Sequence, residues 1–264
     1  MEAAGRPMTK KKTAVISGGA GGLGRALSMA LQARGWRVVL LDLDVSGLDS
    51  SETQIPIRCD LTDSTQLRSK AEQIEQQYPV IDLVIYNAGI TQIGGFDTID
   101  EASHRRVFDI NYFAAVAMAG HFLAAVRRAS GTHIAVSSVA GFTPLYHRTS
   151  YAASKHALEG FFKSLRSEER PYGVDVLIAA PSFVATNIGN DQRQIDGIAR
   201  PGSAADGMDY MTPEAAAEEI LRGLGRRQPM IPVGRVARLA WWVNSLAPRL
   251  YQRLMERQIG GHEG

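Results

Sequence analysis

The chain has little cysteine, little net charge and no long apolar run. Among its 264 residues Cys59 is the only cysteine, which excludes an intramolecular disulfide framework and a cysteine-based metal cluster. The formal net charge of +2 is too small to indicate a nucleic-acid partner. A transmembrane helix needs about eighteen consecutive apolar residues, and the nearest stretch, Phe113–Val126, is shorter and contains His121. We expect a soluble, cytoplasmic protein, because a lone cysteine also fits a reducing compartment.

Composition and histidine spacing narrow the class further. The six histidines show no His-Glu-x-x-His or paired ligand spacing, so no metal site is expected. Hydrophobic residues make up 45% and charged residues 21%, which is close to the globular average and allows a sizeable core. Residues 1–12 are small, polar and basic, and we expect them to form a disordered leader.

Short β-branched apolar runs alternate with segments of helical period along the chain. Strands are expected at Thr13–Ser17, Arg37–Asp42, Ile55–Cys59, Ile81–Tyr86, Thr132–Ser137, Val174–Ala180 and Met230–Val233. Helices are expected at Gly22–Arg34, Asp63–Gln77, Ser103–Arg128, Tyr151–Arg170 and Pro213–Gly225. Strands apolar on both faces that alternate with helices predict a parallel sheet covered on both sides. The expected fold class is α/β: a doubly wound Rossmann fold with a single parallel sheet of about seven strands.

A glycine-rich turn follows the first strand directly. Ser17-Gly18-Gly19-Ala20-Gly21-Gly22-Leu23-Gly24 stands between that strand and the first helix. Glycine permits a tight turn and lets the backbone approach a pyrophosphate at the N–H groups of a helix N-terminus. Glycines also serve ordinary turns, so Asp42 matters: an acid ending the second strand can accept hydrogen bonds from an adenosine ribose. This order of elements predicts a dinucleotide site, and the lack of Gly-Lys-Ser/Thr argues against a nucleoside-triphosphate loop.

Asp42 also bears on which dinucleotide binds. Its carboxylate would face and repel the 2′-phosphate of NADP. The neighbouring positions Gly19 and Leu43 supply no cation to compensate. Arg25 and Arg37 are the close basic residues, and an ordinary surface role suits both. We expect NAD as the cofactor.

Tyr151 and Lys155 lie four residues apart at the start of a helical segment, so they share one face. A tyrosine exchanges protons near neutral pH only if its phenolate is stabilised, and a nearby ammonium does that. Taken alone, Tyr-x-x-x-Lys is a common accident. Ser137-Ser138 closes the preceding strand at the edge where ligands bind, although serines before Gly141 also suit a plain turn.

Six motifs follow one another in order between Thr13 and Thr186. They are the glycine turn, Asp60-Leu61 after the third strand, Asn87-Ala88-Gly89 after the fourth, Asn111 in a helix, Ser138, and Tyr151 with Lys155. With these motifs the chain resembles the classical short-chain dehydrogenases/reductases, a family of oxidoreductases with this fold. The resemblance covers most of the chain and is specific, because the motifs match in both order and type.

The resemblance implies catalytic roles for Asn111, Ser138, Tyr151 and Lys155. Tyr151 would be the general acid in ketone reduction and the general base in alcohol oxidation. Lys155 would lower the pKa of Tyr151 and bind the nicotinamide ribose, Ser138 would hold the substrate oxygen, and Asn111 would position a water. The residues that the resemblance places at the cofactor are Ser17, Gly18, Gly22, Leu23, Gly24, Asp42, Asp60, Leu61, Asn87, Ala88, Gly89, Tyr151, Lys155, Pro181 and Thr186.

Three positions depart from the family pattern. Ser17 replaces a threonine and keeps the hydroxyl, and Tyr86 stands where an asparagine is usual. Ser182 replaces the glycine that normally follows Pro181, which removes backbone freedom near the nicotinamide. None of the three removes a catalytic group.

The loops after the fourth, fifth and sixth strands form the substrate pocket in the family. Their side chains here are mostly apolar, which favours a moderately large hydrophobic alcohol or ketone: steroid-like, aryl or fatty. The candidate substrate residues are Ile90, Ile93, Phe142, Leu145, Tyr146 and Phe183. Any one of them can instead pack its own loop. Residues 187–211 are expected to form a mobile lid.

One Rossmann-type domain is expected over residues 13–235, with an amphipathic helical extension of the same domain over residues 236–264. Arginines outnumber acids in this extension, and two tryptophans accompany an apolar stripe. The stripe consists of Val236, Leu239, Ala240, Val243 and Leu246. We expect it to dock on its own domain or on a neighbouring subunit, with a membrane surface as the alternative.

The sequence thus favours NAD(H)-dependent interconversion of a secondary alcohol and a ketone. We expect a homodimer or homotetramer, because the family associates through its two long helices and Phe113–Val126 is apolar all round. The alternatives are an NADP(H)-dependent carbonyl reductase of the same fold and a dinucleotide-sensing protein without turnover. The intact catalytic positions argue against the sensor, because a pure binder needs no activated tyrosine.

Overall fold

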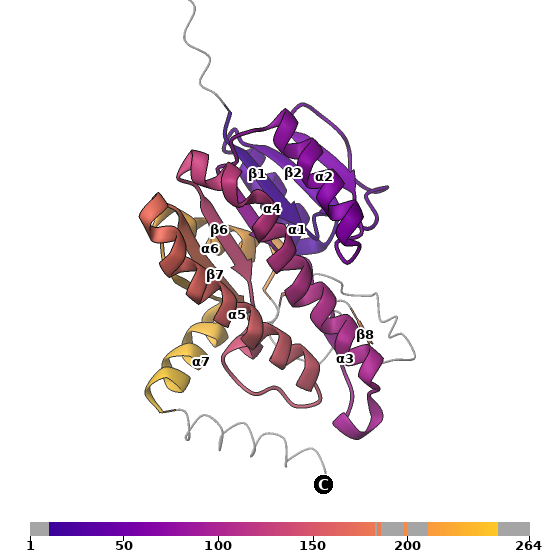
Figure 1. Ribbon diagram of the computed structural model, residues 1–264. Coiled ribbons are helices and arrows are strands. Elements are labelled where there is room, and N and C mark those ends of the chain that lie inside the picture. Colours follow the sequence, from indigo (N-terminus) through magenta and orange to yellow (C-terminus); the bar gives the residue numbers. More distant parts are fainter. Residues whose placement is uncertain (1–10, 183, 186–197, 200–210, 248–264) are drawn as a thin grey trace, which may run out of the picture.

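A computed structural model describes residues 11–182, 184–185, 198–199 and 211–247 of the chain (Figure 1). Four expectations lie wholly or mostly outside these residues: the leader, the candidates Phe183 and Thr186, most of the lid, and the extension beyond residue 247.

Seven parallel strands form one sheet in the order β3-β2-β1-β4-β6-β7-β9, which confirms the predicted fold class. The strands are β1 (Thr13–Ser17), β2 (Arg37–Asp42), β3 (Gln54–Arg58), β4 (Leu83–Tyr86), β6 (Thr132–Val136), β7 (Asp175–Pro181) and β9 (Met230–Val233). The order reverses direction between β1 and β4, because the chain crosses over the sheet after β3. Ligands of open α/β sheets bind at the carboxyl end of such a switch point.

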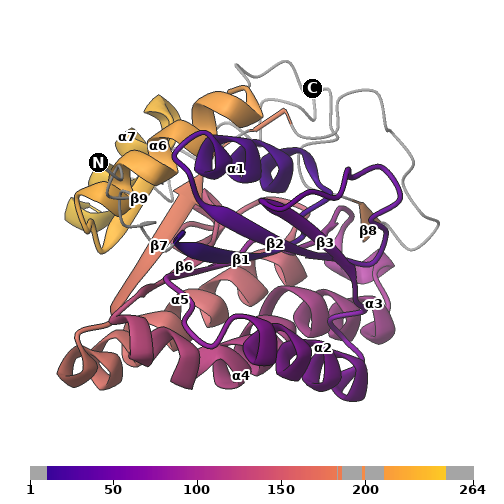
Figure 2. The same cartoon turned by 90° about the horizontal axis from the view of Figure 1, so that it is seen from above.

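Helices cover both faces of the sheet. They are α1 (Gly22–Gln32), α2 (Ser64–Gln77), α3 (Glu101–Phe108), α4 (Ala114–Ala129), α5 (Thr149–Glu169), α6 (Pro213–Gly225) and α7 (Arg235–Leu246). Figure 2 shows α1 and α6 on one side of the sheet and α2, α4 and α5 on the other. Val15 packs toward the second group, whereas its strand neighbours Ala14 and Ile16 pack toward α1 and α6. Both faces of each central strand are therefore buried, which explains the continuous apolar runs.

The predicted helix Ser103–Arg128 is a longer and less regular element. It begins at Glu101, passes through a π-helical segment η2 (Asp109–Phe113) and ends at Ala129. By length and composition Glu101–Ala129 could cross a membrane. Met118 and Phe122 of α4 are nevertheless packed in the core, as expected for the core helix of a globular domain. Single π turns often occur at functional sites, and this one contains Asn111.

A second, two-stranded sheet is an addition that the sequence did not predict. β5 (Thr91–Gln92) pairs antiparallel with β8 (Ile198–Ala199). Three short 3₁₀ turns complete the described elements: η1 (Phe96–Thr98), η3 (Val139–Gly141) and η4 (Arg170–Tyr172).

The C-terminal helix α7 forms where expected, and its apolar stripe is only partly buried. Val236, Leu239 and Leu246 of the apolar stripe do not pack on their own domain but are exposed, so for them docking on a neighbouring subunit stays a prediction. The buried side chains of α7 are the alanines Ala237 and Ala240. Small side chains let a helix approach its neighbours closely, so the contact surface follows alanine rather than the bulkier residues.

Tyr86 and His133 form a buried polar pair in the core below α5. The Tyr86 hydroxyl and His133 Nδ1 lie 2.7 Å apart, and the rings are stacked with centroids 5.9 Å apart. Phe162 packs against the tyrosine ring. Burial lowers the pKa of His133 from 6.5 to about 4, because the imidazolium would lose its hydration there.

This buried histidine should make the fold sensitive to acid. The unfolded chain takes up a proton near pH 6.5 and the folded chain only near pH 4, so stability falls across that window as pH decreases. His133→Gln keeps an acceptor for Tyr86 and cannot become charged. We expect it to reduce the loss of unfolding free energy between pH 7.5 and 4.5 by up to about 3 kcal/mol, measured by urea denaturation.

The matched control is His156→Gln. His156 is exposed, so its ring is hydrated in both states and the substitution should leave the acid sensitivity unchanged. Equal acid sensitivity in wild type and His133→Gln would contradict the assignment.

Candidate active site

The side-chain hydroxyl of Ser17 joins the carboxyl ends of β1 and β4 through hydrogen bonds. Ser17 Oγ accepts from the backbone N–H groups of Asn87 at 3.0 Å and Ala88 at 3.2 Å. The amide of Asn87 in turn donates to the carbonyl oxygen of Gly18 at 2.9 Å. The serine that replaces the family's threonine thus ties the glycine turn to the Asn-Ala-Gly loop.

The glycine turn has the shape of a phosphate cradle. Gly18 has φ +64°, a left-handed conformation that favours glycine. A Cβ on Gly24 would overlap the Gly18 carbonyl oxygen and lie 2.9 Å from Gly19 Cα. The residue before α1 is Gly21, which provides no side-chain cap for the N–H groups of Gly22 and its neighbours. These residues fit a dinucleotide, because uncapped N–H groups at a helix N-terminus attract a pyrophosphate.

Asp42 lies beside this turn, as predicted from its position. Its Oδ2 accepts a hydrogen bond from the Ala20 N–H at 2.8 Å. Arg25 is directed to backbone carbonyls instead of to the carboxylate, with 2.8 Å bonds to Ala20 and Gly47. The negative charge of Asp42 therefore stays at the mouth of the phosphate cradle.

Asp60 lies after the end of β3 and organises its own loop. Its Oδ1 accepts from the Thr62 hydroxyl at 2.7 Å and from the Thr62 N–H at 2.9 Å. These bonds to Thr62 hold the pKa of Asp60 below its ordinary value. The side chain of Leu61 packs against the core on the side of α2.

Asn111 is buried in the π segment and fixed by three hydrogen bonds. Its Oδ1 accepts from the Ile90 N–H at 2.8 Å, while its Nδ2 donates to the Ile90 carbonyl and to Ser154 Oγ, each at 2.9 Å. A Cβ on Gly89 would lie 3.2 Å from Asn111 Oδ1 and 3.5 Å from Lys155 Nζ. The structure thus brings Asn111 and Lys155 to the same glycine.

Ser138, Tyr151 and Lys155 also converge here. The Ser138 hydroxyl accepts from the Ala140 N–H at 3.2 Å and lies near enough to Tyr151 to lower the pKa of the phenol. Lys155 Nζ donates to the Val136 carbonyl at 2.9 Å and lies 5.8 Å from the centroid of the Tyr151 ring. All four predicted catalytic residues therefore surround one point at the carboxyl edge of the sheet.

Burial governs the protonation of both titrating groups. It raises the pKa of Tyr151, opposed by the hydrogen bond from Ser138 and by the positive charge of Arg148. It lowers the pKa of Lys155 to about 8, partly opposed by the negative charge of Glu159. Ser138 and Arg148 thus act on Tyr151 in the direction that favours the phenolate.

The candidate substrate residues fall into two groups. Ile90, Ile93, Phe142 and Leu145 are half-buried in the loops after β4 and β6. Tyr146 is 49% exposed and stacks on His147, with ring centroids 3.7 Å apart. Pro181 is buried at the carboxyl end of β7.

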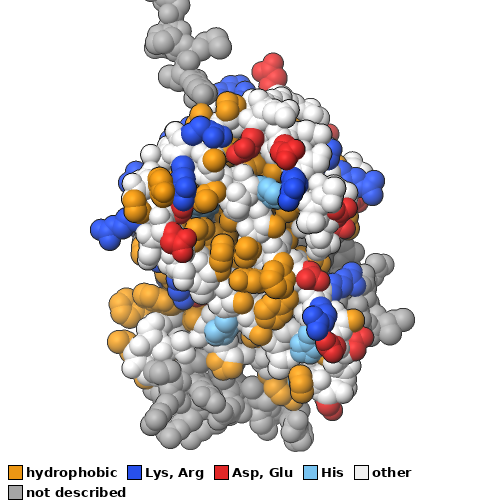
Figure 3. Space-filling view, in the orientation of Figure 1, with side chains coloured by type: hydrophobic (Ala, Val, Ile, Leu, Met, Phe, Trp, Pro, Cys, Tyr) orange, Lys and Arg blue, Asp and Glu red, His pale blue; other side chains and the backbone are white. Residues whose placement is uncertain are grey.

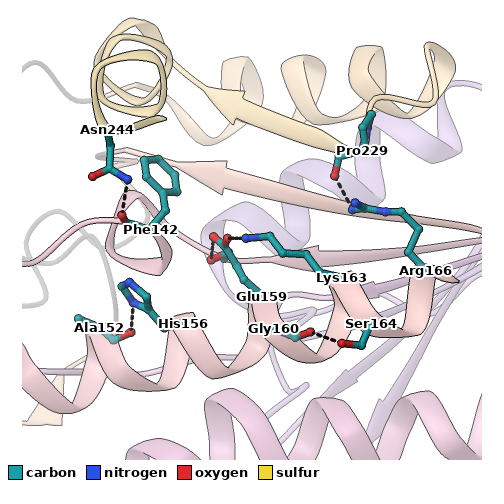
Figure 4. Close-up of polar contacts among 11 residues, drawn as sticks. Phe142, Ala152, His156, Glu159, Gly160, Lys163, Ser164, Arg166, Pro229 and Asn244 are labelled. Atoms are coloured by element: carbon teal, nitrogen blue, oxygen red, sulfur yellow. Dashed lines mark hydrogen bonds and ion pairs between the residues drawn. The ribbon is translucent and has the colours of Figure 1, made fainter. Parts of the chain in front are cut away.

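Several contacts at the site were not predicted from the sequence. Ser154, just before Lys155, is the partner of Asn111, and its place one turn after Tyr151 could have indicated this. Asn244 on α7 donates to the Phe142 carbonyl at 2.8 Å (Figure 4). Gln92 is buried and accepts from the Ser150 N–H at 3.4 Å. The last two pairs are distant in sequence, so no local signal announces them.

A family model described as short chain dehydrogenase matches residues 12–196. The chain belongs to the short-chain dehydrogenases. Dehydrogenase/reductase SDR family member 7B from Bos taurus is 30% identical and covers 95% of this chain and 82% of its own. The protein of the same name from Xenopus tropicalis is 32% identical and covers 91% of this chain and 83% of its own.

Solved short-chain dehydrogenases have the same fold. One from Burkholderia cenocepacia, in complex with NADP, has a TM-score of 0.80 and 22% identity, covering 93% of this chain and 98% of its own. One from Burkholderia phymatum, in complex with NAD, has a TM-score of 0.71 and 20% identity, covering 84% of this chain and 88% of its own. This short-chain dehydrogenase is accordingly an oxidoreductase-family protein with a dinucleotide-binding fold.

Proposed function

We propose that the protein interconverts a secondary alcohol and a ketone with NAD(H), using Tyr151 as the proton donor and acceptor. The observation that carries this proposal is the convergence of Ser138, Tyr151, Lys155 and Asn111 beside the glycine turn. A protein that only sensed a dinucleotide would need the turn but not this buried proton-transfer set.

The residues of the chain divide the work as follows. The glycine turn and Asp42 hold the adenosine and pyrophosphate, and the bound nicotinamide supplies or accepts the hydride. Ser138 orients the substrate oxygen, and Tyr151 Oη gives it a proton in reduction or removes one in oxidation. The Lys155 ammonium stabilises the phenolate when it forms, and Asn111 holds the loop of Gly89 and Ile90 against the site.

Apolar side chains support a hydrophobic substrate. Ile90, Ile93, Phe142 and Leu145 are half-buried around the catalytic edge and would shield the reacting carbon from water. A moderately large steroid-like, aryl or fatty alcohol fits such surroundings.

Tyr151→Phe removes the hydroxyl and preserves the ring packing. We expect kcat to fall by about 10²- to 10⁴-fold, because general acid–base catalysis contributes that much. Turnover is measured with a panel of hydrophobic secondary alcohols plus NAD and ketones plus NADH, and NADH binding by fluorescence transfer from tryptophan. Tyr172→Phe, at a half-exposed tyrosine remote from the site, should change neither. Near-native turnover in Tyr151→Phe would overturn the proposed chemistry.

Asp42→Asn tests the choice of nucleotide. The side-chain oxygen can still accept from Ala20, but the charge that repels a 2′-phosphate is gone. We expect wild type to bind NADH more tightly than NADPH, and the variant to lose at least roughly tenfold of that preference, which equals about 1.4 kcal/mol. Asp44→Asn, at an exposed acid two residues on, is the control. A wild-type preference for NADPH would select the NADP(H)-dependent reductase instead.

We also propose that the protein is a homodimer or homotetramer joined through α4 and α5. Apolar side chains gather over these helices in Figure 3. Phe113, at the end of η2 just before α4, is 56% exposed. Tyr112 contacts both Phe113 and Phe161 of α5, which extends the apolar surface across the two helices.

Phe113→Glu should separate the subunits, because a carboxylate would be buried in the interface without a partner. Light scattering at micromolar concentration is expected to show a dimer or tetramer for wild type and a monomer for the variant. Met29→Glu, on the exposed side of α1, should leave the mass unchanged. A monomeric wild type would refute this proposal.

A further inference from the structure

A carboxylate is buried directly behind the proposed catalytic residues. Glu159 lies one helical turn after Lys155 on α5 and is 1% exposed. Its Oε1 accepts from Ser137 Oγ at 2.9 Å, and its Oε2 is paired with Lys163 Nζ at 2.7 Å. Figure 4 shows Lys163 reaching back along the helix to this carboxylate. The proposed reaction does not use Glu159.

The turn that follows Ser138 closes against this carboxylate. A Cβ on Gly141 would overlap both Ser137 Oγ and Glu159 Oε1, so backbone and carboxylate are in direct contact there. Ser138 stands between Ser137, which Glu159 holds, and the turn η3, which packs on Glu159. The position of the Ser138 hydroxyl therefore depends on a side chain that does not touch it.

Glu159 and Lys155 are four residues apart on α5 and both are buried, so they share one face of the helix. The ammonium of Lys155 is buried, and its hydrogen-bond acceptor is the neutral Val136 carbonyl. The other groups around it are Tyr151 on its own helix, the amide of Asn111 on η2, the backbone at Gly89, and Ser138 after β6. Among these described groups Glu159 supplies the negative charge, and the half-exposed Lys163 neutralises it only in part.

Packing alone does not require an ion here. Burying a carboxylate is costly, and replacing a buried ion pair by apolar side chains of similar size is often neutral or stabilising. A residue that served only to fill space on α5 would more economically be a leucine.

We propose that Glu159 is a positioning residue of the active site: its carboxylate fixes Ser137, and with it the Ser138 turn, and its charge keeps Lys155 an ammonium. The inference rests on the proposed function for its catalytic consequence. Burial already lowers the pKa of Lys155 to about 8, and Glu159 acts in the opposite direction. Without Glu159 a substantial fraction of Lys155 would be a neutral amine near pH 7.5, unable to stabilise a phenolate.

Three substitutions separate the hydrogen bond of Glu159 to Ser137 from the effect of its charge on Lys155. Glu159→Gln keeps an oxygen that can accept from Ser137 but removes the charge. Lys163→Gln leaves the carboxylate and removes the cation that partly neutralises it. Ser137→Ala removes the hydrogen bond and leaves both charges in place.

The first readout uses the cofactor-free protein. The folded-state pKa of Lys155, about 8, lies below the ordinary value of 10.5, so the unfolding free energy rises with pH between these values. Glu159→Gln should start this rise at lower pH and Lys163→Gln at higher pH, each by roughly half a pH unit for one charge at this helical spacing. Ser137→Ala should leave the onset where it is. Urea unfolding between pH 6.5 and 10 measures it.

The second readout is the alkaline limb of ketone reduction with NADH. This limb should move to lower pH in Glu159→Gln and to higher pH in Lys163→Gln. Ser137→Ala should lower kcat about tenfold without moving the limb. The proposal would be overturned if both charge variants moved the onset and the limb in the same direction, or if Glu159→Gln moved neither. Glu159 would then only fill space in the core. If Glu159→Gln does not fold, Lys163→Gln still tests the proposal, because the unfolding free energy of that variant should begin to rise at a higher pH than in wild type. If no dinucleotide binds, the proposed function fails, while the unfolding readout still judges Glu159.

Discussion

The buried face of α5 is the constraint on which the site depends. Its N-terminal half buries the polar residues Ser150, Tyr151, Ser154, Lys155 and Glu159. Its C-terminal half buries the apolar Phe162 and Leu165, and Glu169 at its end is paired with Arg127. The apolar half anchors the helix against the sheet in the larger core cluster. The polar half is then pressed against the carboxyl ends of β4 and β6, where every buried polar group requires a partner. Those partners come from the strand ends, from the π segment that contains Asn111 and from the η3 turn. The catalytic geometry therefore follows from the hydrogen bonds that the buried polar side chains of α5 require.

The same burial sets the electrostatics. Desolvation raises the pKa of Tyr151 and lowers that of Lys155, and both changes favour the neutral forms. An active tyrosine that forms a phenolate needs charges that oppose this tendency. In the described structure they are the cation of Arg148, which acts on Tyr151, and the anion of Glu159, which acts on Lys155. A bound nicotinamide, positively charged when oxidised, would add to the first of these.

The seven strands and the ends that hold Ser17, Asn87 and Ser138 could be predicted because apolar runs and turn residues are local signals. The features that the sequence could not reveal are contacts between residues far apart along the chain, or elements too short to show a periodic pattern. β5 and β8 are two residues each and about a hundred residues apart, so no periodicity marks their pairing. A helical glutamate is normally solvated, and Glu159 is buried only because Ser137 and Gly141 come to it from another element. For α7 the bulkier residues Leu239 and Leu246 of the stripe are exposed, and the close contact with the domain is made by Ala237 and Ala240.

The nucleotide-binding half differs from the catalytic half, because the selectivity that we propose for it rests on a charge that is held in place. The Ala20 N–H binds Asp42 Oδ2, so the carboxylate cannot turn away from the turn without leaving a backbone donor unpaired. Arg25, in the first turn of α1 after the glycine turn, is bonded to two backbone carbonyls and adds no direct ion pair to Asp42 among the described contacts. A 2′-phosphate arriving there would meet an anion fixed by its own hydrogen bond. A ribose hydroxyl would meet an acceptor already oriented for it, and this difference is the reason that we propose NAD.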